Sequence, residues 1–330
     1  MDQQTQPVQV SFGEQNCRCI SNIVFNKRHV FAVGTWNVKK YNEIFVNEYL
    51  ELEQKIVQLY RIPINGLVEK IISKKEQLYI IYIDPQQRKT KLCCIELADN
   101  GRYQVNFDLL YEGLTNVLCP EDDPIIYLSS NKSIIQFDLN KQSFDNIIDD
   151  NDLYNLCEQD PHHKNLFVRS QNNYLCIQDT REKKVTKFKA HSLQILDIDF
   201  NPNKQYYLIT GGEDCLAKVW DIRKTQYAIK SFEDLQNSVL QAKFNKFHDQ
   251  LVSLSFDDGT ISLYNITSVS SVPQLNKEDD YLVKQYDEHE DSIYGLSWSR
   301  GTAWVLASIG YSGHMIINTV PTTEKYKILL

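Results

Sequence analysis

The stretch KAHSLQILDIDFNPNKQYYLITGGEDCLAKVWDIR, from Lys189 to Arg223, decides how the rest of the chain is interpreted. Within it, YLITGG predicts a strand that ends in a glycine pair, and EDC predicts a tight turn. LAKVWDI predicts a second strand, because apolar and polar residues largely alternate along it. A histidine near the start and Trp220-Asp221 near the end raise the question of whether this is one chemical site or one copy of a repeated unit.

The same succession of strand, polar turn and strand recurs along the chain. The units close at Val46-Asn47, Ile95-Glu96, Phe137-Asp138, Gln178-Asp179, Trp220-Asp221, Tyr264-Asn265 and Asn318-Thr319. The intervals between these closing positions are 49, 42, 41, 42, 44 and 54 residues. A period of about 40–45 residues that ends on Trp-Asp is typical of WD40 repeats, and seven such units can close into a ring. The sequence therefore predicts an all-β fold, a single seven-bladed WD40 β-propeller over residues 1–330.

The two widest intervals and the chain ends predict where this propeller departs from regularity. The first interval predicts an elaborated connection between blades one and two, and the last predicts a long loop over residues 266–285 between blades six and seven. An open ring would leave exposed strand edges, so a terminal segment must supply the outer strand of blade seven. We favour residues 8–12 (VQVSF), which leaves 321–330 as a C-terminal tail free to dock. The alternative is that the end of this tail, residues 325–330, is itself the closing strand.

The spacing around Trp220 predicts a buried hydrogen-bond network. In a WD40 unit a turn aspartate lies six residues before the tryptophan, and a serine or threonine lies four residues before that aspartate. Here these positions are Asp214 and Thr210, and His191 precedes the first strand. We expect the Trp220 ring N–H to donate to Thr210, and the network to continue through His191 to Asp214. Such a network satisfies buried polar groups and fixes a tight turn.

The same residue types could also be interpreted as a catalytic triad. We favour the structural role, because Thr210 is predicted to lie in mid-strand beneath an indole and not on a strained turn facing a cleft. Other units keep only parts of the network: blade seven retains His289 and Ser308 but has Ser312 and Asn318 in place of the aspartate and tryptophan. The sequence also contains no G-x-S-x-G, H-E-x-x-H or Walker A pattern. We therefore expect no enzyme activity and no catalytic residue, although a buried Asp/Glu/His cluster in the central channel would indicate otherwise.

Composition narrows the remaining functions. The formal net charge of −8 disfavours a general nucleic-acid binder, which needs a basic field. The eight cysteines form no C-x-x-C pair and mostly lie in apolar runs, so we expect buried free thiols in a reducing cytosol, with no metal site and no cofactor. The N-terminal residues lack the basic start and apolar core of a secretory signal, and no run of 18 apolar residues predicts a membrane span.

The loops on one face of the predicted ring are candidates for partner binding. In blades five to seven these loops carry acidic side chains and one neighbouring glutamine. The candidate residues are Gln194, Glu213, Asp257, Asp258, Asp287 and Asp291. We expect an acidic sector that receives a basic or helical segment of a protein partner, with charge steering the encounter. The alternative is that these are solvated turn residues.

The last 140 or so residues resemble a named family. DIDFNPNKQYYL, FNKFHDQLV, YDEHEDSIYGLSWS and the closing KYKILL are similar to the WD40 proteins that interact with the EARP and GARP complexes. These strings are more specific than the general WD40 pattern. The first 190 residues resemble the family only in blade layout, with FAVGT and KYNEIFV as weak matches. The family has a longer acidic loop between its last two blades, of which only NKEDD (276–280) remains here.

The resemblance implies a non-catalytic adaptor for EARP, a tether at recycling endosomes, and GARP, a tether at the trans-Golgi network. It implies a cytoplasmic protein, peripheral at these membranes, that acts in endosomal recycling and retrograde traffic without inserting into a bilayer. We expect a monomer within a larger complex. The alternative is another WD40 interaction module, such as a histone binder or a peroxisomal import receptor, since an acidic face also suits basic tails.

Overall fold

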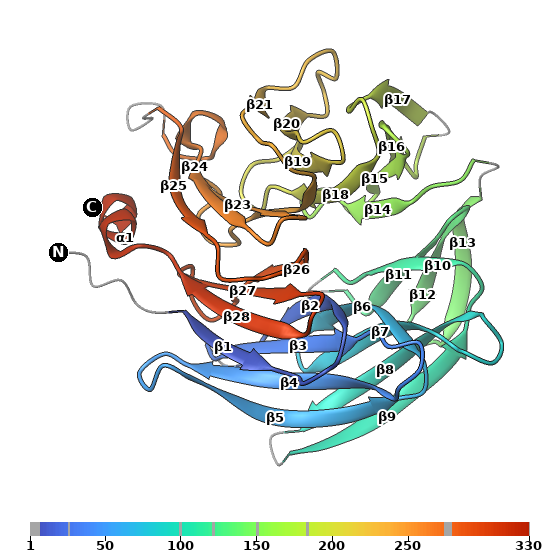
Figure 1. The fold of residues 1–330 in the computed structure, drawn as a ribbon. Coiled ribbons are helices and arrows are strands. Elements are labelled where there is room, and N and C mark those ends of the chain that lie inside the picture. The colour runs from blue at the N-terminus through green and yellow to red at the C-terminus, as the bar shows by residue number, and fades with distance from the viewer. Residues whose placement is uncertain are drawn as a thin grey trace.

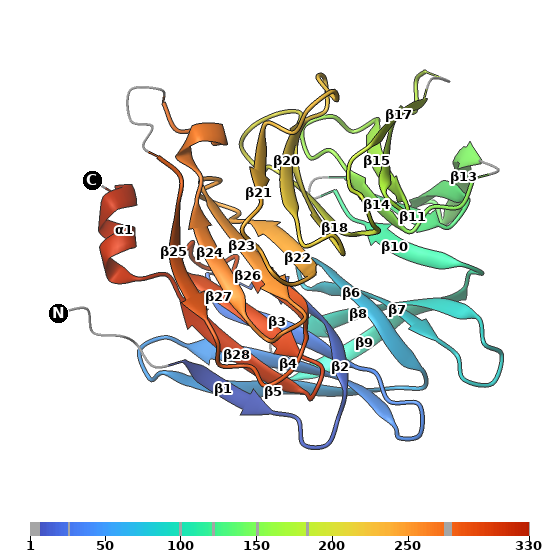
Figure 2. The same cartoon turned by 45° about the horizontal axis from the view of Figure 1, so that its top comes forward.

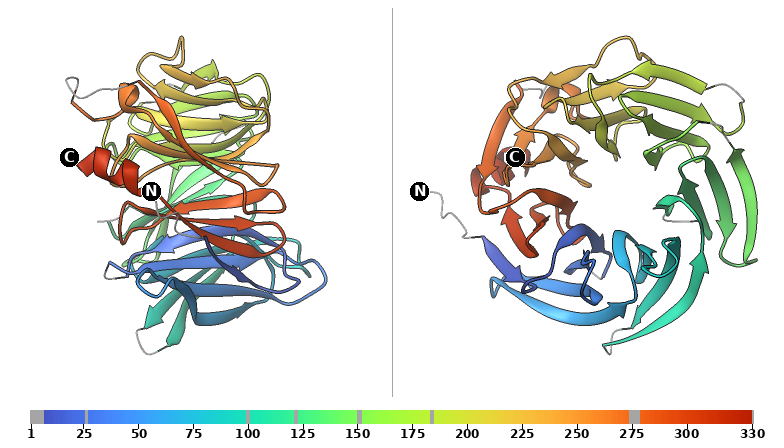
Figure 3. Two further views of the ribbon diagram at one scale, coloured as in Figure 1. Left: turned by 60° about the vertical axis from the view of Figure 1, so that its left-hand side comes forward. Right: turned by 45° about the vertical axis from the view of Figure 1, so that its right-hand side comes forward.

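A computed structural model describes residues 7–25, 27–98, 101–120, 123–149, 152–182, 185–273 and 279–329. Within these residues, 28 strands form seven four-stranded antiparallel sheets arranged as blades around a central channel (Figure 1). The right panel of Figure 3 shows the ring nearly along its axis. The predicted seven-bladed β-propeller is confirmed.

Each blade is a simple meander in which the first strand lines the channel and the last lies at the rim. Blade one contains β2 (Cys17–Ile23), β3 (His29–Thr35), β4 (Asn42–Leu50) and β5 (Lys55–Ile64). Blade two contains β6 (Leu67–Lys74), β7 (Gln77–Ile83), β8 (Thr90–Ala98) and β9 (Arg102–Leu110). Blade three contains β10 (Leu114–Leu118), β11 (Ile125–Ser130), β12 (Ser133–Asp138) and β13 (Ser143–Asp149). Blade four contains β14 (Leu156–Gln159), β15 (Leu166–Gln171), β16 (Tyr174–Asp179) and β17 (Val185–Lys189).

Blade five contains β18 (Ile195–Phe200), β19 (Tyr207–Gly212), β20 (Ala217–Asp221) and β21 (Lys230–Phe232). Blade six contains β22 (Val239–Phe244), β23 (Leu251–Phe256), β24 (Ile261–Asn265) and β25 (Tyr281–Tyr286). Blade seven contains β26 (Ile293–Trp298), β27 (Val305–Gly310) and β28 (His314–Thr319), with β1 (Val8–Ser11) as its fourth strand. The short 3-10 helix η1 (Thr267–Val269) and the α-helix α1 (Thr322–Leu329) are the only helices among the described residues.

The hydrophobic core is divided among the interfaces between blades. Seven clusters of buried apolar side chains occur, and each joins the facing surfaces of two neighbouring sheets. The cluster between blades one and two, for example, contains Ile44 and Ile80, both fully buried. A single four-stranded sheet cannot cover its own apolar face, so each blade depends on its neighbours for burial.

The ring is closed by the N-terminal segment. β1 pairs antiparallel with β28, with Val8 opposite Ile317 and Val10 opposite Met315 (Figure 2). Val8 and Val10 face the cluster between blades seven and one, whereas Gln9 and Ser11 are exposed. This pairing covers the edge that β28 would otherwise present.

The alternative closing strand at residues 325–330 is wrong, because the C-terminal segment forms a helix. Helix α1 lies against the outside of blade six (Figure 1). Its Glu324 is 3% exposed and accepts hydrogen bonds from Asn265 Nδ2 at 2.5 Å and from the Tyr281 hydroxyl at 2.8 Å. The tail is therefore docked by a buried polar contact; Leu330 lies outside the described residues.

The predicted loop over 266–285 is too long, since Tyr281–Tyr286 is strand β25 and Thr267–Val269 is helical. The predicted range includes most of β25, which is the outer strand of blade six. Residues 274–278 lie outside the described part of the chain. The elaborated connection between blades one and two is also wrong: β5 ends at Ile64 and β6 begins at Leu67, and the wide interval is filled largely by the long strands β5, β6 and β7.

Candidate functional site

The network predicted around Trp220 is present in blade five. Trp220 Nε1 donates to Thr210 Oγ1 at 3.0 Å, and the Thr210 oxygen lies 2.8 Å from His191 Nε2. His191 Nδ1 lies 2.7 Å from Asp214 Oδ1. Burial lowers the pKa of His191 despite the nearby Asp214 carboxylate, which favours a neutral ring. A neutral ring that donates from Nδ1 to Asp214 accepts at Nε2 from the Thr210 hydroxyl, so the four side chains form one directed chain.

This geometry serves packing better than nucleophilic catalysis. Thr210 has no exposed surface, and its hydroxyl lies between the indole and the imidazole within strand β19. A nucleophile must reach a substrate that also contacts its stabilising groups. The neighbouring Gly212 completes the packing, since a Cβ there would lie 2.5 Å from His191 Nδ1. The network therefore fixes the turn between β19 and β20.

Blade seven carries an incomplete version of the network. His289 Nε2 lies 2.8 Å from Ser308 Oγ, but its Nδ1 is buried without a hydrogen-bond partner. Burial lowers the pKa of His289 to about 4, with a further contribution from His314. A Cβ built on Gly310 would contact both His289 Nδ1 and Asp291 Oδ1, so these two atoms lie on the same side of Gly310. The acid near His289 in this blade is therefore Asp291 and not a residue of the turn after β27. Asp291 Oδ2 accepts from the Ser312 backbone N–H, whereas its Oδ1 is buried without a hydrogen-bond partner.

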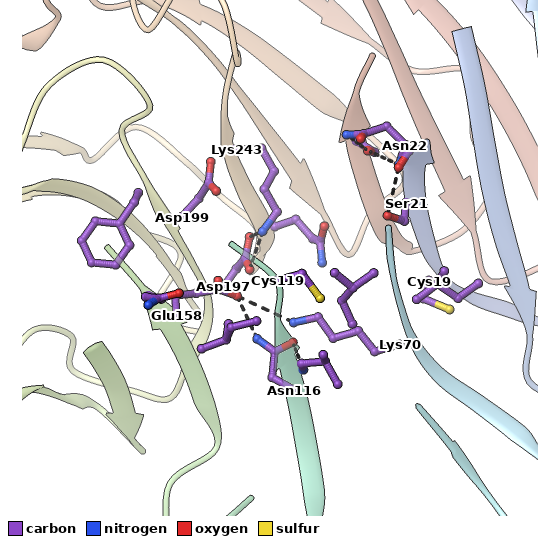
Figure 4. A pocket seen from close by; sticks show the side chains of 18 of the residues that line it. Cys19, Ser21, Asn22, Lys70, Asn116, Cys119, Glu158, Asp197, Asp199 and Lys243 are labelled. Atoms are coloured by element: carbon purple, nitrogen blue, oxygen red, sulfur yellow. Dashed lines mark hydrogen bonds and ion pairs between the residues drawn. The ribbon is translucent and has the colours of Figure 1, made fainter. Parts of the chain in front are cut away.

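The central channel is a cavity of about 890 Å³ lined mainly by the first strands of the blades. It contains a cluster of acidic side chains, which is the kind of feature that would indicate enzyme activity according to the sequence analysis above. Figure 4 shows that Glu158, Asp197 and Asp199 lie near Lys70 and Lys243. Asp197 lies 2.7 Å from Lys243 Nζ, and Glu158 lies 3.8 Å from Lys70 Nζ. Burial raises the pKa of Glu158, which Lys70 opposes.

These carboxylates also join adjacent blades. Asp197 accepts from the Ala242 backbone N–H at 3.0 Å, and Asp199 accepts from that of Phe244 at 2.8 Å. Both contacts link β18 of blade five to β22 of blade six, and Asp199 also pairs with Lys246 at 2.9 Å. The backbone bonds that these two carboxylates accept give them a structural role at the interface between blades five and six.

Other polar side chains connect inner strands in the same way. Asn22 Nδ2 in blade one donates to the Trp298 carbonyl of blade seven at 2.9 Å, and Asn116 Nδ2 in blade three donates to the Cys157 carbonyl of blade four at 2.7 Å. These contacts were not predicted from the sequence. The i, i+2 spacing of Asp197 and Asp199 places two charged side chains on one face of a strand, and this pattern could have indicated them.

The acidic candidates lie on the face where inner strands begin and where second and third strands are joined, which we call the top face. Glu213, Asp257 and Asp287 are exposed there, and Glu213 N donates to the carbonyl of exposed Gln194 at 3.0 Å. Asp258 is also exposed but stabilises its own turn, because it accepts from Asn237 Nδ2 at 2.6 Å and from the Thr260 hydroxyl at 2.7 Å. The five acidic candidates therefore fall into two groups. Glu213, Asp257 and Asp287 are exposed, whereas Asp258 and Asp291 accept hydrogen bonds from neighbouring residues.

The cysteines show no arrangement of a reactive or metal-binding site. None of the eight forms a disulfide bond; six are buried, and Cys119 and Cys215 are partly buried. Burial raises the pKa of Cys19, Cys93 and Cys157 to about 12, so these thiols stay protonated at neutral pH. Among the described residues, no group of three or more His, Cys, Asp or Glu side chains is placed to hold a metal ion. In that part of the chain, no helix has the length and apolarity needed to cross a bilayer.

A closed ring of seven blades, a WD-type network in blade five and an exposed top face define a β-propeller of the WD-repeat class. The chain belongs to the EIPR1 beta-propeller family, whose model matches residues 9–264. EARP and GARP complex-interacting protein 1 of Homo sapiens is 36% identical over 184 residues, which cover 49% of this chain and 45% of the human protein. EARP-interacting protein 1 of Caenorhabditis elegans is 33% identical over 176 residues, covering 49% and 46%.

A plant protein, WD repeat-containing protein DWA2 of Arabidopsis thaliana, is 24% identical over 169 residues, which cover 48% of this chain and 47% of that protein. The chain spans about half the length of the curated relatives it matches. The family is therefore shown, and the predicted resemblance to it is confirmed. The match of the family model begins at residue 9 and ends at residue 264, so it also covers the N-terminal blades, for which the sequence predicted a similarity in layout only.

Proposed function

We propose that this protein is a non-catalytic adaptor that binds the EARP and GARP tethering complexes in endosomal recycling and endosome-to-Golgi retrograde traffic. The observation that carries the proposal is membership of a family whose relatives are named for these complexes. The contacts within blade five and the channel support a non-catalytic role, because His191 and Thr210 fix a turn within the blade and Asp197 and Asp199 join blades five and six.

The adaptor would be cytoplasmic and peripheral at the trans-Golgi network and endosomes, and it would reach these membranes through the tethers. Affinity purification of the tagged full chain, followed by mass spectrometry, tests this directly. Recovery of the subunits shared by EARP and GARP above an untagged control would support the proposal. Recovery of histones with nuclear localisation, or of cargo with peroxisomal localisation, would favour the alternative interaction modules.

We propose a steering role for the acidic sector, which we now restrict to Glu213, Asp257 and Asp287. These carboxylates are exposed and uncommitted, so their field acts on an approaching basic segment more than it anchors a bound one. Changing all three to lysine should slow association with the tether at low salt, with a smaller effect at high salt. A matched triple change of the exposed Glu76, Asp145 and Glu182, which lie away from the top face, should leave association unchanged. Equal rates for both variants would exclude steering by this sector.

A further inference from the structure

Arg18 lies at the top mouth of the channel and has no acidic partner among the residues that the structure describes. It lies near the start of β2, and its guanidinium carbon is 4.1 Å from the Trp36 ring centroid, 5.2 Å from that of Tyr294 and 5.8 Å from that of Tyr311. Its Nε is buried without a hydrogen-bond partner, and it forms no ion pair with any residue the structure describes. The carboxylate of Glu69 accepts from Trp36 Nε1 at 2.8 Å and does not pair with Arg18.

This arrangement is suited to receive an anion. Aromatic rings stabilise the faces of a guanidinium through cation–π contact, and its N–H donors lie in the plane of the group. A planar fork of donors matches the two oxygens of a carboxylate. A partly buried positive charge is costly to leave unpaired, and a partner carboxylate would relieve that cost.

A rigid turn with exposed apolar side chains adjoins Arg18. The turn runs from Trp36 to Tyr41 between β3 and β4, and Asn42 fixes it by accepting from the Asn37 backbone N–H at 2.7 Å and donating to the Asn37 carbonyl at 2.9 Å. Within this turn Val38 is 72% exposed and Tyr41 is 92% exposed. Because the backbone is already ordered, binding at these side chains costs little conformational entropy.

The composition of this region is that of an interaction hot spot. We define the aromatic surface as Arg18, Trp36, Val38, Tyr41, Tyr294 and Tyr311, contributed by blades one and seven. Arginine, tryptophan and tyrosine are the residues that most often dominate binding energy at protein interfaces. The exposed Lys39 in the same turn adds a positive charge that no described residue neutralises.

We propose that the aromatic surface docks an acidic segment of a protein partner, with a partner carboxylate paired to Arg18 and an apolar partner side chain on Val38 and Tyr41. The inference rests on the proposed function, in that the partner is a subunit of the tether. It differs from the steering role of the acidic sector, because an acidic segment is repelled by Glu213, Asp257 and Asp287 and attracted by Arg18. The top face thus has two regions that favour segments of opposite charge. Only the aromatic surface, on blades one and seven, has partly buried side chains that can bind a partner tightly.

The test uses the purified full chain and the purified EARP complex in a surface-binding assay. Two variants change the aromatic surface: Arg18→Gln removes the cation, and Val38→Ser with Tyr41→Ala removes the exposed apolar side chains. The matched controls are Arg61→Gln, on the outer strand of the same blade, and Tyr227→Ala, which is 80% exposed on the opposite face. Thermal unfolding of every variant checks the fold; Val38 and Tyr41 are too exposed for their change to disturb it.

We expect each surface variant to weaken binding at least tenfold and each control to leave it within twofold. Wild-type binding that both surface variants retain would overturn this inference and leave the proposed function standing. Failure of the wild-type chain to bind EARP would overturn both. If Arg18→Gln proves unstable, the Val38/Tyr41 variant decides.

A peptide array of the tether subunits tests the chemistry of the occupant. The chain should bind peptides rich in aspartate and glutamate, and Arg18→Gln should abolish that signal. Selective binding of basic peptides, unaffected by Arg18→Gln, would contradict an acidic occupant.

Discussion

His191 belongs to a group of residues that resembles a catalytic triad and that forms a buried hydrogen-bond network. Its ring connects Thr210 to Asp214 inside blade five, where no substrate reaches the threonine hydroxyl. The value of the network lies in satisfying groups that burial would otherwise leave unpaired.

Replacing Thr210 with valine should therefore destabilise the protein by about 2–3 kcal/mol, because Trp220 Nε1 and His191 Nε2 would both lose their partner. Urea unfolding measures the change. Thr186→Val on the exposed strand β17 is the matched control and should stay within about 0.5 kcal/mol. Similar small effects from both changes would mean that the network contributes little.

Buried histidines also predict how stability depends on pH. The unfolded chain binds a proton at each histidine near pH 6.5, whereas burial lowers the folded pKa of His191 and brings that of His289 to about 4. The unfolded state then binds more protons, so stability is fully present above about pH 7 and falls as the pH drops toward 4.

For His289 alone the loss between pH 7 and pH 5 should be about 2 kcal/mol. Unfolding of His289→Gln at both pH values should show a loss smaller by that amount than the wild type. Parallel pH profiles for the two proteins would show that His289 is not held neutral.

The residue network could be predicted because its members lie within 30 residues of one another at fixed spacing. The contacts of Arg18 could not be predicted, because they combine Trp36 with Tyr294 and Tyr311. These tyrosines approach Trp36 only when blade seven closes on blade one. Local spacing carries no information about contacts that ring closure creates.

At the scale of elements, helix α1 contacts blade six through the buried carboxylate of Glu324, through Lys327 Nζ, which lies 3.3 Å from the Tyr281 hydroxyl, and through the packing of Ile328. Glu324→Ala would remove the bonds from Asn265 and Tyr281 and should cost about 1.5–3 kcal/mol. Hydrogen exchange should rise in β24, β25 and α1, while blades two and three stay protected. The exposed Thr323→Ala is the matched control. Unchanged exchange in β24 and β25 would mean that the helix is not anchored through Glu324.

Strand β1 gives an element-scale test in which neighbouring residues act as controls. Changing Val8 and Val10 to aspartate places two charges against the core between blades seven and one, so the melting temperature should fall by several degrees. The same change at Gln9 and Ser11, which are exposed on the same strand, should have little effect. Equal effects would show that β1 is not the closing strand.

The pattern of residues predicted the repeated strands well and the connecting segments poorly. The third strand of each unit closes on a recognisable position, but the fourth strand is short or irregular in composition, as in Lys230–Phe232. The sequence therefore predicts a loop where β25 lies. It predicts a free tail where α1 lies, because the buried partner of Glu324 is 59 residues away at Asn265.

At the scale of the whole molecule, seven apolar clusters and polar contacts between the inner strands of neighbouring blades join the blades into one ring. A surface that is already ordered before binding costs less conformational entropy to engage. The period predicted the number of blades, whereas the pairs that join them, such as Asp197 with Lys243, depend on strand register that no repeat pattern specifies.

Direct binding of the tether by the propeller is what we propose, and it can be measured with purified components. The most direct measurement is reconstitution: the purified full chain is mixed with purified EARP and with purified GARP, and each mixture is resolved by size-exclusion chromatography with light scattering. The account predicts co-elution with both complexes, with one copy of the chain in each assembly. Elution of the chain as a free monomer at micromolar concentration in both mixtures would contradict it.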